Sequence, residues 1–497
     1  MSTHIKDTAV SEPLVAPGAQ NPDGAPIKVL VAIANHGHGN ARYLKMLIDT
    51  FKSMRHAVKV VVLSDVPKEL GEDVEVRVGA PTSDPWSLPF AYKPLFMERA
   101  DDYDLFIYSE DDTHIEERHI DGYLEATRVL PDDRIAGFVR YELDGQGDRY
   151  YSSIFGPYHW EPGSVEKHGG MTFARLTNDH SGAFMLTRDQ LKRCIAHGGF
   201  MAPPRSGTYD MLVTAATDPY TQCGLRKMIC ISELNRFALH HLPNKYWTRE
   251  LLWIADERIV KAQLAALASS SGVQVSSLFA RTPGLRNVRW HKVYYEGPVH
   301  EVMQAIPPSA KHILSVGMGC GSTEVELVRR GHAVHAIPLD SVVGAWAESM
   351  GVQVASPDWH AAGKALTGIP FDAIVVHDTI QYVEDPAGLL AEMAQRFRAR
   401  PVVLTYPNVD HVSLRKQLVM NGPDRDDVRS IGDYEVCGVH ATTPHAVDRW
   451  ATAAGLRRHR LVPLFTGEKY LRLDRLTLGR LRGLLAHRFL AVYSTPK

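Results

Sequence analysis

The chain begins the same kind of structural unit twice. An apolar, β-branched run at 27–33 is followed by a turn rich in His, Gly and Asn, a helical stretch over 41–54 and a second β-branched run at 58–65. Another apolar run at 313–316 leads through a glycine-rich turn and a helix into a strand-like run at 333–337. This order predicts parallel strands joined by right-handed crossovers. The sequence therefore predicts an α/β chain with two Rossmann-like domains, each binding ligands beyond the carboxyl ends of its strands.

The composition excludes several classes of protein. Among 497 residues, 44% are hydrophobic and 23% are charged, which excludes a disordered or fibrous chain. The formal net charge of -2 provides no global field toward nucleic acid, so nucleic acid is not an expected partner. Five cysteines without a CxxC pair favour a reducing compartment, and we expect a cytoplasmic location. No apolar run reaches the roughly 18–20 residues that cross a bilayer.

The expected domain organisation follows from the two starts. Residues 1–26 are rich in Pro, Gly and Ala, lack the features of a signal peptide, and are predicted to be a disordered leader. We expect the first domain over 27–247 and the second over 310–497. Residues 248–309 contain an apolar-periodic helical segment and a Pro-Pro pair, and they are predicted to form a partly helical connector.

The glycine-rich turn of the second half carries its clearest motif. Gly317, Gly319 and Gly321 allow a ligand to approach the backbone and the amides of the following helix. Taken alone, such a turn suits a dinucleotide, S-adenosylmethionine or a plain tight turn. The segments 371–386, 402–408, 438–443 and 489–493 follow it in order. Together they resemble the fourth strand, the fifth strand with its Pro-Asn turn, the His-and-Thr segment and the closing strand of class I S-adenosylmethionine-dependent methyltransferases.

This resemblance implies a binding site for S-adenosylmethionine. It places the carboxypropyl group over the glycine turn, the ribose on an acid after the second strand, and the adenine near the residues preceding Asp378. The sequence departs from the family at Ser315 and Pro338, where acids are usual, and at Gln381, where Glu is frequent. Asp340 lies two residues beyond Pro338, and we expect it to bind the ribose hydroxyls.

Methyl transfer to a hydroxyl group requires alignment and a base that removes the proton. His377 and His440 are the predicted bases of the second half. Each is also compatible with a packing or surface role.

An acidic triplet is the main motif of the first half. The apolar strand predicted at 104–108 runs directly into Glu110, Asp111 and Asp112. Two carboxylates spaced by one residue can hold a divalent cation that neutralises a diphosphate, although acidic loops are also often simply solvated. With the parallel core before it and the Ser-Gly-Ala-Phe strand after it, this triplet resembles the metal-binding motif of GT-A type glycosyltransferases over about 27–247.

The resemblance assigns expected roles in the first half. Glu110 and Asp112 would hold Mn²⁺ or Mg²⁺, and a late histidine, His240 or the adjacent His241, would complete the metal site. Asp210 is the candidate base for an inverting reaction, or else only a helix N-terminal acid. The expected nucleotide-sugar contacts are Asn35, His36, Asp65, Lys93, Glu110 and Asp111.

The leading hypothesis is a bifunctional enzyme of glycan biosynthesis. The first half would transfer a sugar from a nucleotide-sugar donor to a glycan acceptor, and the second would methylate a sugar hydroxyl. One alternative keeps a single active half with the other as a binding module. Another is a scaffold for glycan-assembly proteins, in which an Arg- and Leu-rich stretch over 472–488 docks a membrane or a partner. The oligomeric state is not predicted.

Overall fold

The structure is a computed structural model. It describes residues 25–153, 158–207, 209–247, 253–269, 276, 278, 292–398, 401–420 and 434–494. The leader predicted over 1–26 lies outside the described residues except for its last two positions, and much of the predicted connector lies outside them as well.

The first unit is built on a mostly parallel five-stranded sheet with the order β11-β4-β1-β2-β3. Strand β4 pairs in parallel with β1, and β11 closes this side of the sheet in the antiparallel direction. The strands are β1 (Lys28–Asn35), β2 (Ala57–Ser64), β3 (Glu75–Val78), β4 (Leu105–Glu110) and β11 (Ala183–Thr187). Its helices are α1 (Ala41–Lys52), α2 (Tyr92–Glu98), α3 (Glu117–Val129), α4 (Arg188–Ala196), α5 (Met211–Thr214) and α6 (Asp218–Thr221).

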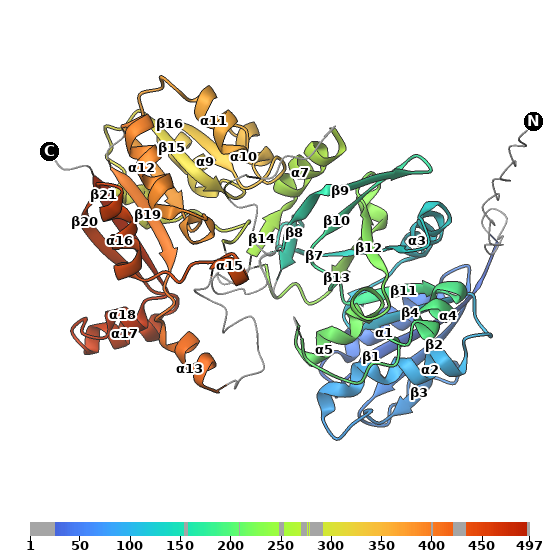
Figure 1. Cartoon of the computed structure of the whole chain (residues 1–497). Coiled ribbons are helices and arrows are strands. Elements are labelled where there is room, and N and C mark those ends of the chain that lie inside the picture. Colours follow the sequence, from blue (N-terminus) through green and yellow to red (C-terminus); the bar gives the residue numbers. More distant parts are fainter. Residues whose placement is uncertain are drawn as a thin grey trace, which may run out of the picture.

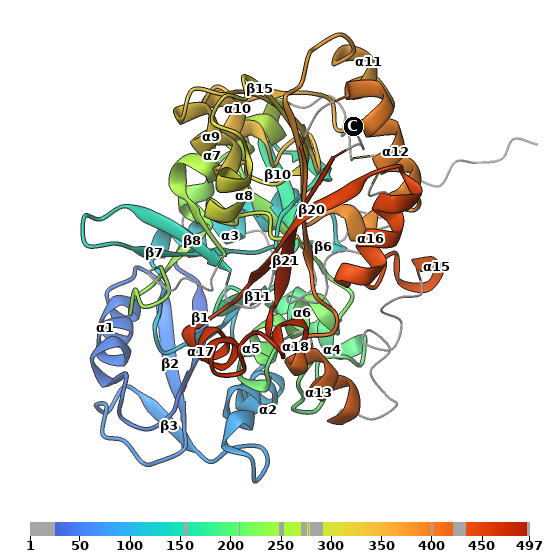
Figure 2. The same ribbon diagram turned by 90° about the vertical axis from the view of Figure 1, so that its left-hand side faces the viewer.

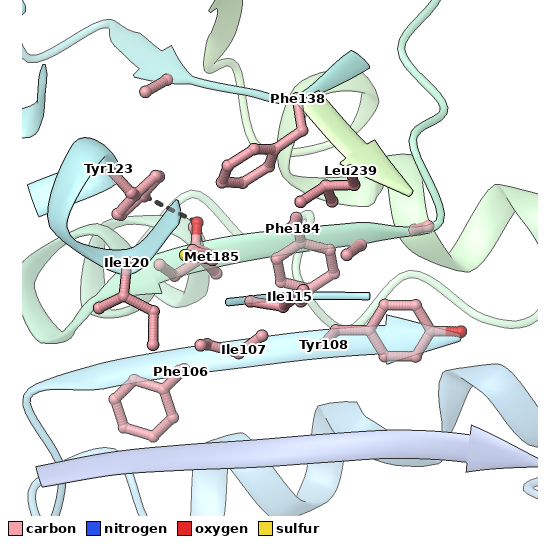
Figure 3. Close-up of a cluster of buried hydrophobic side chains, with 14 of the residues drawn as sticks. Phe106, Ile107, Tyr108, Ile115, Ile120, Tyr123, Phe138, Phe184, Met185 and Leu239 are labelled. Carbon is pink, nitrogen blue, oxygen red and sulfur yellow. Dashed lines mark hydrogen bonds between the residues drawn. The ribbon is translucent and has the colours of Figure 1, made fainter. Parts of the chain in front are cut away.

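Two smaller sheets extend this unit, with the orders β6-β12-β10-β9 and β14-β8-β7-β13-β5. Their strands are β5 (Thr113–His114), β6 (Arg134–Ala136), β7 (Val139–Leu143), β8 (Arg149–Ser153), β9 (Trp160–His168), β10 (Met171–Leu176), β12 (Arg226–Cys230), β13 (Ala238–His241) and β14 (Trp253–Asp256). One apolar core joins these sheets to the main sheet. In Figure 3, Tyr123 and Phe138 lie beside Met185 of the main sheet, and the Tyr123 hydroxyl donates to the Met185 carbonyl over 2.7 Å. Phe106 and Tyr108 contact Phe96 and Tyr92 of α2 instead.

The second unit contains a seven-stranded sheet with the order β17-β16-β15-β18-β19-β21-β20. Only β21 runs antiparallel to its neighbours. The strands are β15 (His312–Met318), β16 (Ala333–Pro338), β17 (Gln353–Val354), β18 (Ala373–His377), β19 (Val402–Pro407), β20 (Arg457–Leu464) and β21 (Arg488–Ser494). This is the Rossmann-like sheet expected for the second half, with its closing strand at the expected place.

Helices surround this sheet and extend from one end of it. They are α8 (His300–Ala305), α9 (Ser322–Arg329), α10 (Ala345–Ser349), α11 (Trp359–Ala365), α12 (Pro386–Phe397), α13 (Val412–Met420), α15 (Tyr434–Cys437), α16 (Pro444–Ala453), α17 (Glu468–Leu476) and α18 (Arg482–Leu485). No helix within the described ranges is both long and apolar enough to cross a membrane.

Helix α7 (Glu257–Ser269) lies between the two units (Figure 1). It follows β14, which pairs with β8, so the chain continues in a sheet of the first unit beyond residue 247, where we predicted the connector to begin. On the other side, the Gln263 amide donates to the Val343 carbonyl over 3.5 Å and accepts from the Tyr295 hydroxyl over 3.0 Å. The predicted connector therefore contributes packed structure to both units.

Candidate functional sites

The first candidate site lies where β1 and β4 diverge. The chain runs from β1 to β2 and β3 on one side of the sheet and returns to β4 on the other side, so the carboxyl ends of β1 and β4 form a topological switch point. Ligands of open α/β sheets bind at such points. Asn35 ends β1 and Glu110 ends β4, so the acidic triplet lies at this edge.

Asp111 is held by the loop that follows β1. Its two carboxylate oxygens accept hydrogen bonds from the side-chain amides of Asn35, over 2.5 Å, and Asn40, over 2.7 Å. Burial raises the pKa of Asp111 to about 6. Since both oxygens already have partners, the residue ties the two loops together rather than presenting a free carboxylate.

Asp112 is the triplet residue best placed to bind a ligand. Its Oδ2 lies 3.3 Å from Nε2 of His241, and its buried Oδ1 has no hydrogen-bond partner in the described structure. Nδ1 of His241 lies 2.5 Å from the carboxylate of the fully buried Glu142, which also accepts from the amides of Tyr246 and Trp247. Glu142, His241 and Asp112 thus form a row in which a carboxylate orients an imidazole, as commonly seen behind metal ligands.

Of the two adjacent histidines, His241 faces Asp112 and His240 does not. Successive side chains of a strand point to opposite faces, and in β13 His241 faces Asp112. His240 instead stacks on Tyr141 with ring centroids 5.2 Å apart, and its Nε2 lies 2.9 Å from Asn244 Oδ1. Nothing in the local sequence distinguishes the two histidines. Glu142 belongs to no recognisable motif, and it lies more than a hundred residues before Tyr246, whose amide donates to it.

Glu110, the first residue of the triplet, lies near a cation, Arg140. Its Oε2 lies 3.7 Å from the buried Arg140 guanidinium. Burial outweighs this attraction and raises the pKa of Glu110 to about 7. Gly182 adopts a φ of +75°, and a Cβ there would lie 2.4 Å from Thr113 Oγ1 and 3.3 Å from Glu110 Oε2. The turn before β11 therefore closes tightly over the acidic loop.

The remaining predicted contacts divide into two groups. Asp65 accepts from the Gly37 amide over 2.7 Å and lies 3.3 Å from His36, so both border the loop after β1. Lys93 and Asp210 have structural partners instead. The buried Lys93 ammonium lies 2.5 Å from Asp218, and it is therefore paired rather than available to a phosphate. Asp210 is exposed and caps α5 by accepting from the Val213 amide over 3.1 Å, its alternative predicted role.

The second candidate site lies at the switch point between β15 and β18. Gly317 adopts a φ of +80°, and a Cβ there would lie 2.4 Å from Thr379 Oγ1. Gly321, with a φ of +86°, begins α9 in the left-handed region. Both positions require glycine, and they bring the backbone of the turn against the loop after β18.

The backbone at Tyr294 lies over the glycine turn. The Tyr294 carbonyl accepts from the Cys320 amide over 2.7 Å, and a Cβ on Gly319 would lie 2.8 Å from that carbonyl oxygen. Tyr294 also helps to line a narrow crevice beside Asp340, which has no room for a water molecule. Ligand pockets usually measure about 300–1,000 Å³. The glycines thus suit S-adenosylmethionine, but the cofactor would have to displace Tyr294.

Asp340 is buried where the ribose was expected. Its Oδ1 accepts from the amides of Val342 and Val343 over 2.8 and 2.7 Å, and burial raises its pKa to about 6. Ser315, the first departure from the family pattern, donates to the buried Glu324 carboxylate over 2.6 Å. A carboxylate from α9 therefore lies beside the strand position at which the family usually has an acid.

His377 and Asp378 belong to a buried cluster of ionisable groups. Ligand atoms of Glu296, His377 and Asp378 lie within 4.8 Å of one another, and they form the one such three-residue group found in the described part of the chain. Arg488 contacts Asp378 and lies 3.4 Å from Glu296, whose carboxylate also contacts Lys292. Two cations thus balance two carboxylates, which makes the cluster an ion-pair network rather than a metal site.

The two predicted bases differ in their availability. Burial lowers the pKa of His377 well below its usual range, and its Nε2 lies 3.1 Å from the Arg488 guanidinium, which can only donate. His440 is half-buried and stacks on Tyr434. Its Nε2 lies 3.0 Å from the Val383 carbonyl, which requires a proton on Nε2 and leaves a lone pair on Nδ1. Of the two predicted bases, His440 is therefore the more available.

Orphaned polar atoms mark the same sheet edge. Asp378 Oδ1 and Gln381 Oε1 are buried without hydrogen-bond partners in the described structure, and Asp378 adopts a φ of +50°. Buried acceptors of this kind are costly to leave unpaired. A ligand with donor groups, such as a ribose, an adenine amine or a sugar, would satisfy them.

Comparisons with known proteins concern the second unit. Residues 298–447 match the family model described as MetW, methionine biosynthesis protein MetW. This match includes the glycine turn, β16, β18, β19 and the first turn of α16, and it supports a methyltransferase unit there. It includes no residue of the first unit. A search of curated proteins gave no match.

Several solved structures show local similarity. An S-adenosylmethionine-dependent methyltransferase from Mesorhizobium loti is 17% identical, with 39% of this chain and 95% of that chain covered and a TM-score of 0.28. One from Archaeoglobus fulgidus is 12% identical over 40% of this chain and 90% of that chain, with a TM-score of 0.30. The N-methyltransferase NodS from Bradyrhizobium japonicum WM9, in complex with S-adenosyl-L-homocysteine, is 14% identical over 40% and 85%, with a TM-score of 0.27.

Proposed function

We propose that the chain is a two-unit transferase that acts on glycans. The second unit methylates a sugar hydroxyl with S-adenosylmethionine, and the first transfers a sugar from a nucleotide-sugar. The observation that carries the proposal is the glycine turn at the switch point of the second sheet, opposite the orphaned acceptors Asp378 and Gln381. The family match over 298–447 supports the same assignment.

The residues of the second unit suit methyl transfer to oxygen. S-adenosylmethionine supplies an electrophilic methyl group on a sulfonium centre. His440 Nδ1 accepts the hydroxyl proton of the acceptor, while its Nε2 proton remains bonded to the Val383 carbonyl. In the network around Glu296 and Arg488, the cations balance the carboxylates, so the sheet edge carries no net charge there. The contact with Arg488 also holds Asp378 in place. A positioned base of this kind contributes about 10²–10⁴-fold to a rate.

The residues of the first unit suit metal-dependent sugar transfer. Asp112 and His241 would hold Mn²⁺ or Mg²⁺, with Glu142 orienting the imidazole and Glu110 next to the cation. A divalent cation stabilises the negative charge that develops on a leaving nucleoside diphosphate. The orphaned Oδ1 of Asp112 supports this assignment, because it is a buried acceptor without a donor.

Calorimetric titration tests both units. We expect S-adenosyl-L-homocysteine to bind the wild-type protein, and a nucleoside diphosphate to bind only with Mn²⁺ present. Gly319→Ala should lose S-adenosyl-L-homocysteine binding, because a Cβ there would keep the ligand from approaching the backbone of the glycine turn. Gly297→Ala, at a nearby exposed glycine with open space around it, is the matched control.

The outcomes separate the possible functions. Nucleotide binding without S-adenosyl-L-homocysteine binding would make the second unit a binding module, an outcome favoured by the position of Tyr294 over the glycine turn. Binding of neither ligand would refute the proposal and favour a scaffold.

A further inference from the structure

The segment from α17 to α18, which we name the Leu-Arg arm (Glu468–Leu485), carries several exposed large apolar side chains. Leu476 and Leu478 are 78% and 84% exposed, the highest values among the large apolar side chains of the described residues. Leu473 and Leu481 are also exposed. Contiguous exposed apolar side chains usually mark an interaction site.

Cations surround these leucines. The arm contains five cations and two carboxylates, and the cations are Lys469, Arg472, Arg475, Arg480 and Arg482. Both carboxylates are paired, Glu468 with Arg472 and Asp474 with Arg482. Among the described residues no carboxylate lies within ion-pair distance of Lys469, Arg475 or Arg480. The arm therefore has a local positive charge on a chain whose net charge is only -2.

Leu478 occupies a backbone position that favours glycine. Helix α17 ends with the Gly479 amide donating to the Asp474 carbonyl and the Leu478 amide donating to the Arg475 carbonyl. This is a Schellman motif, and its left-handed residue is usually glycine. Leu478 adopts a φ of +50° there while its side chain lies in water. Folding therefore gains nothing from this leucine, which points to a role in binding.

The arm is attached to the edge of the sheet that carries the methyltransferase site. The side-chain amide of Asn408, at the end of β19, donates to the carbonyls of Gly483 and Ala486 over 2.8 Å each. The chain then enters β21 at Arg488, which contacts Asp378. Figures 1 and 2 show α17 and α18 beyond the end of the sheet, with α13 beside α18. Helix α13 adds the exposed Val412 and Lys416.

We propose that the Leu-Arg arm docks this protein on an anionic membrane surface. Leucines at the turn enter the interface between headgroups and acyl chains, and the surrounding cations bind the anionic headgroups. A second copy of the chain is a poorer occupant, because a symmetric contact would bring like charges together. A nucleic acid would not bury the exposed leucines in an apolar environment. The arm also has no exposed aromatic side chain for base stacking.

Vesicle co-sedimentation tests the proposal. The full chain is mixed with phosphatidylcholine vesicles and with vesicles that also contain about 30% phosphatidylglycerol, at low and high salt. We expect binding to the anionic vesicles only, and less binding at high salt. Arg475→Gln with Arg480→Gln should weaken binding about 25-fold, at about fivefold per cation.

Leu478→Gly separates binding from folding. Glycine suits the left-handed position, so the thermal unfolding midpoint should stay the same or rise. Vesicle binding should fall about tenfold, since one inserted leucine is lost. The controls change exposed residues of similar type elsewhere, Val78→Ser for the leucine and Lys45→Gln with Lys261→Gln for the cations.

Three results would overturn the proposal. In the first, the wild-type protein binds neutral and anionic vesicles equally, or binds neither. In the second, Leu478→Gly binds vesicles as tightly as the wild-type protein does. In the third, the protein dimerises and the arm variants abolish the dimer. The last result would identify the arm as a contact between copies.

Discussion

Asp112 and Asp111 are adjacent acids with opposite environments. Both oxygens of Asp111 accept from asparagine amides, whereas Oδ1 of Asp112 has no partner in the described structure and Oδ2 faces His241. A ligand can therefore gain a carboxylate oxygen from Asp112 without breaking a hydrogen bond. Spacing in the sequence could not separate the two, because their partners come from other strands.

We expect Asp112→Asn to abolish Mn²⁺-dependent binding of a nucleoside diphosphate and sugar transfer while the protein remains folded. Asparagine retains one oxygen but lacks the charge that attracts the cation. Calorimetry with and without Mn²⁺ provides the measurement, and Asp210→Asn is the control because asparagine also caps helices well. Unchanged binding by Asp112→Asn would exclude the metal role.

Asp340 makes the stability of the second unit dependent on pH. Burial raises its pKa from 3.8 to about 6, so the native protein holds this proton more tightly than the unfolded chain does. Its contribution to the free energy of unfolding is complete below pH about 4 and is lost as the pH rises to about 6. The shift corresponds to about 3 kcal/mol.

Asp340→Asn should remove this contribution. The amide oxygen can still accept from Val342 and Val343, but it carries no charge at any pH. Relative to wild type, we expect the variant to gain about 3 kcal/mol in unfolding free energy between pH about 4 and pH about 7. Urea denaturation at both values measures it, and parallel pH dependence in the two proteins would contradict the assignment.

At the level of elements, the pairing of β13 with β5 and β7 brings the first site together. It places His241 opposite Thr113 and brings Glu142 to the other side of the imidazole. Strand periodicity predicts that one of two successive histidines faces the site, but the pairing decides which one. A slip of one residue would turn His240 toward Asp112.

Glu142→Gln tests whether this carboxylate positions His241. We expect Mn²⁺ affinity to fall about 10–100-fold, the usual effect of losing a carboxylate behind a metal-binding histidine. Glu142→Asp should restore part of the affinity. A purely structural role would lower the unfolding midpoint of both variants and leave the Mn²⁺ affinity of the folded protein at the wild-type value.

The whole molecule couples the two units at the glycine turn. The His159 ring of the first unit stacks on Tyr294 with ring centroids 4.3 Å apart, and Tyr294 lies over the turn that would bind S-adenosylmethionine. Helix α7 holds the neighbouring Tyr295 through Gln263. The position of Tyr294 therefore depends on contacts with both units.

We expect His159→Ala to strengthen binding of S-adenosyl-L-homocysteine. Losing an aromatic contact worth about 0.5–1.5 kcal/mol lowers the cost of displacing Tyr294, which corresponds to a gain of about 2- to 10-fold in affinity. His168→Ala, which alters another histidine in the next strand, is the control. Weaker or unchanged binding would show that Tyr294 need not move.

The sequence by itself determined the elements and motifs that depend on local chemistry. Apolar runs predicted the strands that became β1, β2, β4, β15 and β16, and the glycine turn and the acidic triplet follow two of them. These patterns are readable because strand periodicity, positive φ and loop charge involve neighbouring residues.

The tertiary structure alone decided which side chains meet. Lys93 pairs with Asp218, His241 rather than His240 faces Asp112, and Tyr294 lies against the glycine turn. Each of these contacts joins residues that are 26 or more positions apart in the chain. Such pairings depend on strand order, register and packing, which no local pattern encodes.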